Sequence, residues 1–596
     1  KIKFCFKEGK KVPTQPLEID EQYWEKVTKI TKDNEFVSYK FSYSYVYNFL
    51  VRRGFGRLKL NEEGNQFIFV RINNNIVETW EAYQIRDYVI EFTEQVCPKE
   101  EKKEVMDMLY RGAKMYLGPD SLSHLKFISP EFKRNEKNYK IIYFKEKYWK
   151  ISAEGVEERP LNDLDGKVWA EKLINFDAQY LGDDFIKIAK FDDNLLTKNE
   201  KLLEGLGYSK EDFETIKDWF YVRMSDVAKK CHFLRFLLNT SDFYWDKELH
   251  RSHNLKPVPE KRTVQEEFER YQHLLSKLTG FAYLIHKFRN KSCEKGVIGM
   301  DGRNSEVGDS NGRTGKSLLG FAVAEVVPQV YISGKNKQLT EDQFLFEEVT
   351  KKHDNIFIDD TRANLDYEYF FPAITGKITV NGKGSKKFTL SAEDSPFFYF
   401  TTNHSINGFT GSFKDRQFLL AFSDYYSDEW KPVNDFNVNF FVEWDAEQRN
   451  LFFNMVAHSL IIYFKTLENK WGLPSSGLIQ APVERLELRQ MRQFVGELFL
   501  SWADTYYGIV ETDSGIEVQS MNIDQAVERK VLYTDFMELL TISDKKYYTP
   551  QNFKKRFKVW CKYRNLFFNK HKLDKEGLQG GDDKRDSVEY FTVSKF

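Results

Sequence analysis

The segment from residue 296 to residue 327 constrains the fold of this chain more than any other part of the sequence. A short apolar run at 296–300 is followed by a loop rich in glycine and polar residues, and then by an apolar stretch at 318–327 with the character of a helix. A strand, a loop and a helix in this order form the unit in which phosphate-binding loops occur. The sequence therefore predicts an α/β core with a parallel sheet around this segment.

The loop carries the residue types that a phosphate site needs. Glycines let backbone N–H groups approach phosphates, a lysine reaches the β- and γ-phosphates, and a hydroxyl at the helix start ligates magnesium. The pattern GxxxxGK[ST] is met except at its first position, where Ser310 replaces glycine. We therefore predict that the loop binds ATP and Mg²⁺, with Lys316 as a catalytic residue and Ser317 as a metal ligand. The predicted ATP-binding residues are Ser310, Asn311, Gly312, Arg313, Thr314, Gly315, Lys316 and Ser317. The alternative, for the loop taken alone, is a glycine-rich surface turn.

A second motif provides two acids. Residues 355–360 form an apolar strand that ends in Asp359 and Asp360. We predict that Asp359 holds Mg²⁺ through water and that Asp360 orients or polarises the attacking water. An ordinary surface strand end is the alternative for this motif alone, but its position after one helix and one strand pairs it with the loop.

Two further residues complete the predicted site. Residues 396–403 form a buried strand whose polar end delivers Asn403, and Arg416 precedes another apolar strand at 417–422. Asn403 is expected beside the γ-phosphate, where it positions water. Arg416 is expected to act across a subunit interface and to stabilise charge on the transferred phosphoryl group. The alternatives are an asparagine that starts a turn and a solvated surface arginine.

The order of these motifs resembles that of superfamily 3 helicases, within the primase-helicase family of poxviruses, phages and mobile genetic elements. The resemblance is strongest over residues 295–425, where the family's motifs are compressed between Ser310 and Asn403. It implies an AAA+-like ATPase core. In that core, the resemblance implies that Lys316 and Ser317 belong to Walker A and that Asp359 and Asp360 belong to Walker B. Asn403 is then the sensor and Arg416 the arginine finger.

The resemblance also implies a function and partners. It implies an ATP-dependent DNA helicase that translocates on single-stranded DNA as a homo-hexameric ring during phage or mobile-element DNA replication. The expected partners are single-stranded and forked DNA, together with a primase or a replication-initiation protein. The alternatives are an initiator or scaffold without processive unwinding, and the helicase part of a primase-helicase. The expected location is the cytoplasm of the host cell.

Two basic segments are predicted to contact DNA. The loop at 376–390 combines glycines and lysines with no acid, as a segment that follows a phosphate backbone requires. A basic helix begins at Thr549-Pro550, and a strand at 588–593 would complete a winged-helix-like module. The predicted DNA-contacting residues are Lys377, Lys383, Lys386, Lys387, Lys554, Lys555, Lys558 and Lys562. A solvated hairpin and a solvated basic helix are the alternatives.

The composition limits which partners and which kinds of fold remain possible. Lys plus Arg (89) nearly equals Asp plus Glu (90), so any basic footprint is local. The five cysteines are widely spaced, which argues against a disulfide framework or a zinc ribbon. No apolar run approaches the length of about 18 residues that a membrane span needs, so no membrane partner is expected.

The chain length of 596 residues predicts roughly three to five domains. We expect an α+β accessory domain, a helical domain, the ATPase core, a helical region and the winged-helix-like module. Their expected ranges are 1–150, 151–290, 291–430, 431–520 and 521–596.

Overall fold

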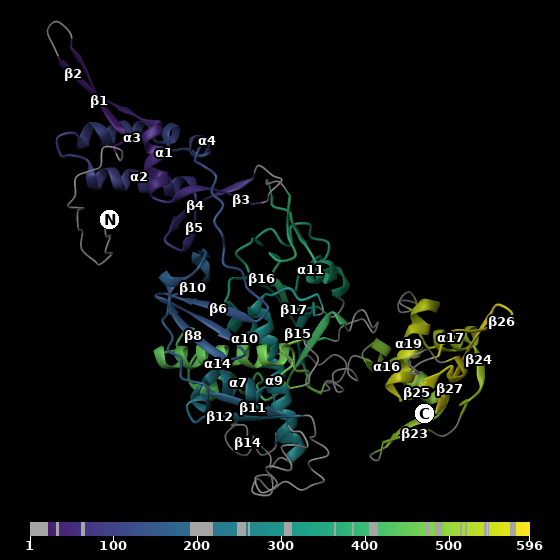
Figure 1. Cartoon of the computed structure of the whole chain (residues 1–596). Coiled ribbons are helices and arrows are strands. Elements are labelled where there is room, and N and C mark those ends of the chain that lie inside the picture. Colours follow the sequence, from purple (N-terminus) through teal and green to yellow (C-terminus); the bar gives the residue numbers. More distant parts are fainter. Residues whose placement is uncertain are drawn as a thin grey trace.

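The structure of the chain, a computed structural model, is shown in Figure 1. It is a multidomain α/β structure that contains a five-stranded parallel sheet. It describes residues 22–595 apart from 31–34, 61–65, 191–218, 247–257, 260–262, 292, 303–312, 363–364, 384–386, 405–414, 472–475, 483–490, 493, 513–514, 519–520, 542–544, 546–547 and 573–579. Within this part of the chain, no helix is long and apolar enough to cross a membrane.

The N-terminal unit combines helices with small sheets, as the sequence predicts. Its strands are β1 (Trp24–Ile30), β2 (Glu35–Phe41), β3 (Phe55–Lys59), β4 (Phe67–Asn73) and β5 (Ile76–Trp80). Its helices are α1 (Tyr43–Arg52), α2 (Ala82–Val96), α3 (Lys102–Tyr116) and α4 (Pro119–Leu122). β4 and β5 form a hairpin, and Asn74 in its turn has a φ of 52, a left-handed conformation that asparagine tolerates.

The domain boundary expected at residue 150 falls within a single sheet. β6 (Tyr139–Phe144), β7 (Lys147–Ser152), β8 (Gly155–Pro160) and β10 (Leu173–Ile174) form one sheet across it, and β9 (Val168–Trp169) pairs with β5. The expected helical domain at 151–290 therefore begins with strands, which continue in β11 (Ile186–Lys190) and β12 (Phe220–Met224). β8 is an edge strand with mostly exposed residues, so no apolar alternation marks it in the sequence.

The parallel sheet of the central unit is buried on both faces. Its strands are β15 (Gly296–Asp301), β16 (Gln329–Ser333), β17 (Asn355–Thr361), β20 (Phe397–Thr402) and β21 (Gln417–Phe422), in the order β16-β17-β20-β15-β21. Every residue of β15 and β20 is buried. Burial on both faces explains why these strands are apolar throughout rather than alternating.

Helices cover one face of this sheet (Figure 1). α7 (His232–Asn239), α9 (Val264–His286), α10 (Lys316–Ala324) and α14 (Ala446–Leu467) share a hydrophobic core with Phe357, Tyr399 and Leu420 of the strands. Their neighbours in sequence, Phe398 and Leu419, point into a second core on the other face. That second core contains α11 (Phe371–Thr375) and the hairpin of β18 (Ile378–Val380) and β19 (Phe388–Leu390). Smaller elements are β13 (Trp245–Asp246), β14 (Val258–Pro259) and α13 (Pro432–Phe436).

The C-terminal unit has a hydrophobic core of its own. It contains α16 (Glu497–Tyr507), α17 (Arg529–Glu538), α19 (Pro550–Tyr563), the hairpin of β22 (Ile509–Thr512) and β23 (Gly515–Val518), β24 (Ala526–Glu528), β25 (Leu566–Phe568), β26 (Asp583–Arg585) and β27 (Val588–Lys595). Thr549 caps α19 as predicted, because its side chain accepts a hydrogen bond from Asn552 N–H. α16 packs in this core although it precedes the boundary expected at residue 520. Helical periodicity does not tell which unit a helix joins.

Candidate active site

The predicted ATP-binding residues that the structure describes lie at the carboxyl ends of the parallel strands. β15 ends at Asp301, and α10 begins at Lys316. Gly315 precedes α10 with a φ of 94, and a Cβ at this position would lie 2.5 Å from the Phe236 ring of α7. The left-handed backbone and the close contact both require glycine. Ser310, Asn311 and Gly312 lie outside the described residues.

Lys316 is buried against an acid that was not predicted from the sequence. Its ammonium forms an ion pair with Asp301 and donates a hydrogen bond to Thr314 Oγ1 at 3.0 Å. Thr314 Oγ1 donates to Asp301 Oδ1 at 2.7 Å. The side chains of Lys316 and Asp301 are only 7% and 2% exposed, so water screens this pair weakly. A polyphosphate that enters the loop has to compete with Asp301 for the lysine. The signal in the sequence was the acid that directly follows the apolar run at 296–300.

Ser317 and Asp359, the two predicted magnesium ligands, are in direct contact. Ser317 Oγ donates a hydrogen bond to Asp359 Oδ1 at 2.7 Å, and Thr401 Oγ1 donates to the same oxygen at 2.6 Å. Tyr331 OH lies 3.4 Å from Asp359 Oδ2. A hydroxyl and a carboxylate are hard oxygen ligands of the kind that Mg²⁺ prefers. The described residues contain no cluster of three or more His, Cys, Asp or Glu that could hold a metal ion. Mg²⁺ in proteins commonly takes its other ligands from phosphates and water.

Asp360 is held in an unusual backbone conformation beside Asn403. Its φ is 55, and the pairing of β17 with β20 shifts register between Ile358 and Thr361. Asp360 N–H donates a hydrogen bond to Thr401 Oγ1 at 2.8 Å. The Asn403 amide donates to Asp360 Oδ1 at 3.3 Å, and the Lys335 ammonium lies 2.9 Å from Asp360 Oδ2. The structure thus brings together Asp360 and Asn403, which were predicted, with Lys335 and Thr401, which were not.

Arg416 lies at the opposite edge of the sheet. It directly precedes β21, whose first residue, Gln417, pairs with Gly296 at the start of β15. Its carbonyl accepts a hydrogen bond from Gly296 N–H at 2.8 Å, and its guanidinium lies 5.3 Å from the centre of the Phe371 ring. In a parallel sheet these strand starts are a full strand length away from Lys316. The structure therefore does not bring Arg416 to the nucleotide site of its own chain.

Arg313 connects the phosphate-binding loop to the segment after β21. It has a φ of 71, and its guanidinium lies 2.5 Å from Asp428 Oδ1. Both side chains are mostly exposed, so the contact is a surface ion pair of small energy. Asp428 was not predicted from the sequence.

The predicted DNA-contacting loop at 376–390 contains the β18–β19 hairpin. Lys377, Lys383 and Lys387 are exposed, and Lys386 lies outside the described residues. The Lys383 ammonium lies 5.7 Å from the centre of the Phe344 ring, and Asn381 donates a hydrogen bond to Gln343 O at 3.0 Å. The hairpin therefore presents lysines to solvent while it packs on the segment around 343–344.

The four lysines predicted on α19 fall into two groups. Lys554 is paired with Asp582 at 2.5 Å and also with Glu589, and Lys558 donates a hydrogen bond to Gly580 O at 3.3 Å. Lys555 and Lys562 are exposed. The acids that engage Lys554 lie in a later segment, so the run of lysines alone did not reveal this difference.

Comparison with known proteins assigns this chain to no family. No protein-family model matches the chain, and no curated protein sequence matches it. What the chain does is therefore inferred from its residues and their geometry.

Proposed function

We propose that this chain is an ATPase of the AAA+-like, superfamily 3 helicase type that moves on single-stranded DNA as a ring. The observation that carries the proposal is the meeting of Lys316, Ser317, Asp359, Asp360 and Asn403 at one edge of a parallel sheet. A buried cation, a hydroxyl beside a carboxylate, and an acid beside an amide are the groups that phosphoryl transfer from a nucleotide requires.

Each of these residues has its own role in the proposed hydrolysis of ATP. Lys316 leaves Asp301 and binds the β- and γ-phosphates, while Ser317 and Asp359 hold magnesium, which neutralises phosphate charge. Asp360 and Asn403 orient the water that attacks the γ-phosphate. Asp360 needs a precise direction for this role, and its left-handed backbone and its contact with Thr401 fix that direction.

The ring is supported by the position of Arg416. An arginine at the far edge of the sheet cannot serve its own site, so in this proposal it serves the site of a neighbouring subunit. A homo-hexamer in which each Arg416 completes the next subunit's site is therefore part of the proposal. The exposed hairpin lysines supply a surface for the strand. The exposed Lys555 and Lys562 of α19, with the β26–β27 hairpin in the same unit, support a winged-helix-like DNA-binding module.

The test of the proposed function is ATP hydrolysis by the full chain with and without single-stranded DNA. We expect turnover that rises when the strand is added, and ATP-dependent separation of a forked duplex. ATP-dependent ring assembly without stimulation by DNA would instead indicate an initiator or scaffold. Negative-stain images with an ATP analogue and single-stranded DNA report the ring directly.

Mixing two inactive variants tests whether Arg416 acts in trans. Arg416→Ala and Asp360→Asn should each hydrolyse ATP very slowly, because one lacks the finger and the other lacks the acid. A mixture should regain part of the activity, because an Asp360→Asn subunit presents its intact Arg416 to the intact site of an Arg416→Ala neighbour. The measurement is phosphate release as a function of mixing ratio. Absence of rescue at every ratio would contradict a finger that acts across an interface.

The hairpin lysines should control binding of the strand. Lys383→Ala combined with Lys387→Ala removes two exposed charges and should weaken binding of a thymidine oligonucleotide. The slope of log affinity against log salt should become shallower by about 0.7 for each phosphate that the variant no longer neutralises. The matched control is Lys103→Ala with Lys114→Ala on α3, which removes the same charge from exposed positions. Equal binding by both double variants would show that the hairpin does not hold the strand.

A further inference from the structure

The sheet β3-β4-β5-β9 of the N-terminal unit has two faces of different character. One face carries a small apolar core that contains Leu58, Ile68, Val70, Val77 and Trp169. Side chains alternate along a strand, so the residues between these point to the other face. Across β3 and β4, the directly opposite pairs on that second face are Phe55 with Arg71, Arg57 with Phe69, and Lys59 with Phe67. Each of these pairs joins a cation to an aromatic ring.

The helices of the N-terminal unit cover one half of this second face. Phe55 is 1% exposed in the core that the helices form, and the Arg71 guanidinium lies 5.0 Å from the centre of the Tyr88 ring of α2. The centre of the Trp80 ring lies 5.7 Å from the same guanidinium. Glu78, the acid opposite Arg71, accepts a hydrogen bond from Trp80 Nε1 at 3.1 Å. In this half, the fold itself supplies the partners of the cation and the rings.

The other half of the face is partly open to solvent. Phe127, which bridges to Arg57 beside β3, is 45% exposed, and Lys59 is exposed as well. The Arg57 guanidinium lies 3.9 Å from the centre of the Phe127 ring and 5.0 Å from that of the Phe67 ring. Arg57 Nε donates a hydrogen bond to Leu125 O at 2.5 Å, which restrains the guanidinium. We name Arg57, Lys59, Phe67 and Phe127 the aromatic platform.

The aromatic platform has the chemistry that holds single-stranded nucleic acid. Bases stack on aromatic rings and on arginine guanidinium groups, and lysines contact the phosphates between them. Lys59, and Lys126 beside Phe127, are exposed and supply positive charge. An apolar protein surface would bury these cations without an opposite charge, which is unfavourable. A strand with unpaired bases offers both the rings and the charge that this face lacks.

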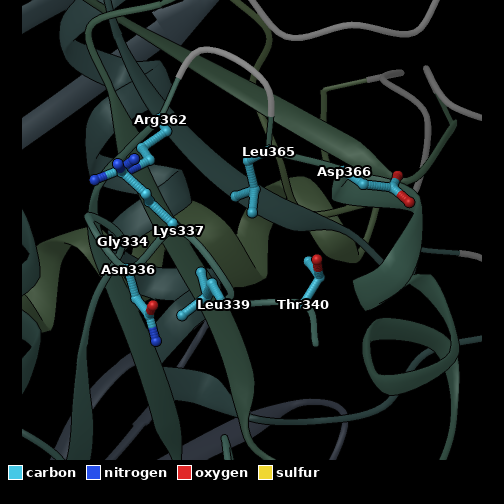
Figure 2. Close-up of a pocket in the computed structure, with 8 residues that line it drawn as sticks. All are labelled: Gly334, Asn336, Lys337, Leu339, Thr340, Arg362, Leu365 and Asp366. Atoms are coloured by element: carbon cyan, nitrogen blue, oxygen red, sulfur yellow. The ribbon is translucent and has the colours of Figure 1, made fainter. Parts of the chain in front are cut away.

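The pocket in Figure 2 does not offer the same chemistry. It has a volume of about 440 Å³ and lies between the segments that follow β16 and β17. The eight residues drawn in its wall are Gly334, Asn336, Lys337, Leu339, Thr340, Arg362, Leu365 and Asp366. None of these eight has an aromatic ring, so a base could make polar contacts there but could not stack on a ring. We therefore assign stacked bases to the platform rather than to this pocket.

The sheet that carries the platform lies at the end of the N-terminal unit nearer the central unit (Figure 1). Lys352, shortly before β17, donates a hydrogen bond to Thr79 of β5 at 3.0 Å. The segment that carries Phe127 continues to Arg134, whose guanidinium lies 2.7 Å from Glu393, shortly after β19. This contact links the platform segment to the hairpin whose lysines are proposed to bind DNA. One strand that is long enough to span both could therefore engage them together.

We propose that the aromatic platform binds single-stranded DNA, with bases stacked on Phe127 and Phe67 and a phosphate at Lys59. This inference goes beyond the proposed function, because it gives the N-terminal unit a DNA site that needs neither ATP nor the nucleotide-binding loop. The site should have little sequence preference, since every base has a face that can stack.

The experiment measures binding of a fluorescent thymidine oligonucleotide to the full chain without nucleotide. Phe127→Ala removes the exposed ring and should weaken binding by at least about fivefold, the smallest effect of one lost stacking contact. Phe127→Trp keeps an aromatic face and should bind like the parent. Tyr110→Ala, which removes an exposed ring of α3 in the same unit, is the matched control and should also bind like the parent.

Two further measurements separate contacts to bases from contacts to phosphates. An abasic oligonucleotide keeps the phosphates but has no bases, so the parent and Phe127→Ala should bind it equally. Lys59→Ala should make the slope of log affinity against log salt shallower by about 0.7, whereas Phe127→Ala should leave that slope unchanged. If Phe127→Ala weakens binding of the abasic and the ordinary oligonucleotide by the same factor, the bases do not stack on this ring and the proposal is overturned.

The outcomes are independent of the proposed ATPase. A parent that hydrolyses no ATP but shows these differences in binding overturns the proposed function and supports the platform. Parental binding of the thymidine oligonucleotide by Phe127→Ala overturns the platform, whether or not ATP is hydrolysed. If Phe127→Ala changes the sedimentation of the chain but not its binding of DNA, the face is a contact between copies of the protein and the proposal is overturned. Tighter binding of a uridine oligonucleotide than of the thymidine one, lost in Phe127→Ala, would assign the platform to RNA and overturn its assignment to DNA.

Discussion

Lys316→Ala is expected to abolish ATP turnover, with a fall in kcat of about 10²–10³-fold or more. The lysine charge stabilises the phosphates as negative charge develops on them, and a methyl group supplies no substitute. The measurement is steady-state phosphate release, with binding of a fluorescent nucleotide recorded on the same preparation. Retained turnover would contradict the assignment of the loop as a nucleotide site.

The structure adds a second effect of this substitution. Asp301 is buried and would be left without the ammonium that pairs with it, and removal of one partner from a buried pair costs about 3–5 kcal/mol. A lower unfolding midpoint should therefore accompany the loss of activity. Asp301→Asn in the same chain should recover stability without recovering turnover, because a neutral amide needs no counter-ion. If the single variant is as stable as the parent, the Lys316–Asp301 pair contributes little to the fold.

Asp354→Asn should destabilise the protein more than any surface substitution. The Asp354 carboxylate is fully buried and lies 2.8 Å from Lys172, 3.1 Å from Lys287 and 3.5 Å from Lys140. These lysines come from the segment after β9, the end of α9 and β6, so one acid joins the N-terminal sheets to the start of β17. Removing its charge leaves three lysines without their counter-ion, which should lower the free energy of unfolding by about 3–5 kcal/mol. Urea denaturation measures this change.

The pH dependence provides an independent check on Asp354. Burial alone would raise the pKa of Asp354, but Lys172, Lys287 and Lys140 outweigh burial and hold it well below its usual value. The contribution of Asp354 to the stability of the fold is therefore present above about pH 4 and is lost as pH falls through the pKa of the folded state. Burial lowers the pKa of Lys140 to about 8, against the attraction of Asp354. Between about pH 8 and about pH 10.4, Lys140 is protonated in the unfolded chain but largely deprotonated in the folded chain. The free energy of unfolding therefore rises with pH in this range.

The stability of Asp354→Asn should rise more steeply with pH than that of the parent. Without the carboxylate, Lys140 and Lys287 keep the cost of burial but have no opposite charge to offset it, so the pKa values of these two lysines fall further. Stability of Asp354→Asn should therefore increase more strongly than that of the parent between about pH 7 and pH 10. Asp394→Asn, which breaks the surface pair with Lys351, should cost less than about 1 kcal/mol and show no such slope. Parallel pH profiles for Asp354→Asn and the parent would contradict the role of this cluster.

Patterns that repeat over short distances were readable in the sequence. The strands at β15, β17 and β20 are apolar throughout because both faces of the sheet are covered, and their polar ends marked Asp359, Asp360 and Asn403. The cap at Thr549 followed from residue type. Parallel strands bring their carboxyl ends to one edge, so the neighbourhood of these residues was also predictable.

The order of residues alone was therefore enough to predict the kind of core, the succession of its motifs and the edge at which they meet. The folded chain was needed to show which charges are paired: Asp301 with Lys316, Lys335 with Asp360, and Asp354 with three lysines. It was also needed to show that β9 joins the N-terminal sheet and that α16 belongs to the C-terminal core. What could and could not be predicted differs in how far apart along the chain the interacting residues lie. Periodicity and capping act between residues a few positions apart, whereas ion pairs, edge strands and unit boundaries depend on where the folded chain brings distant segments together.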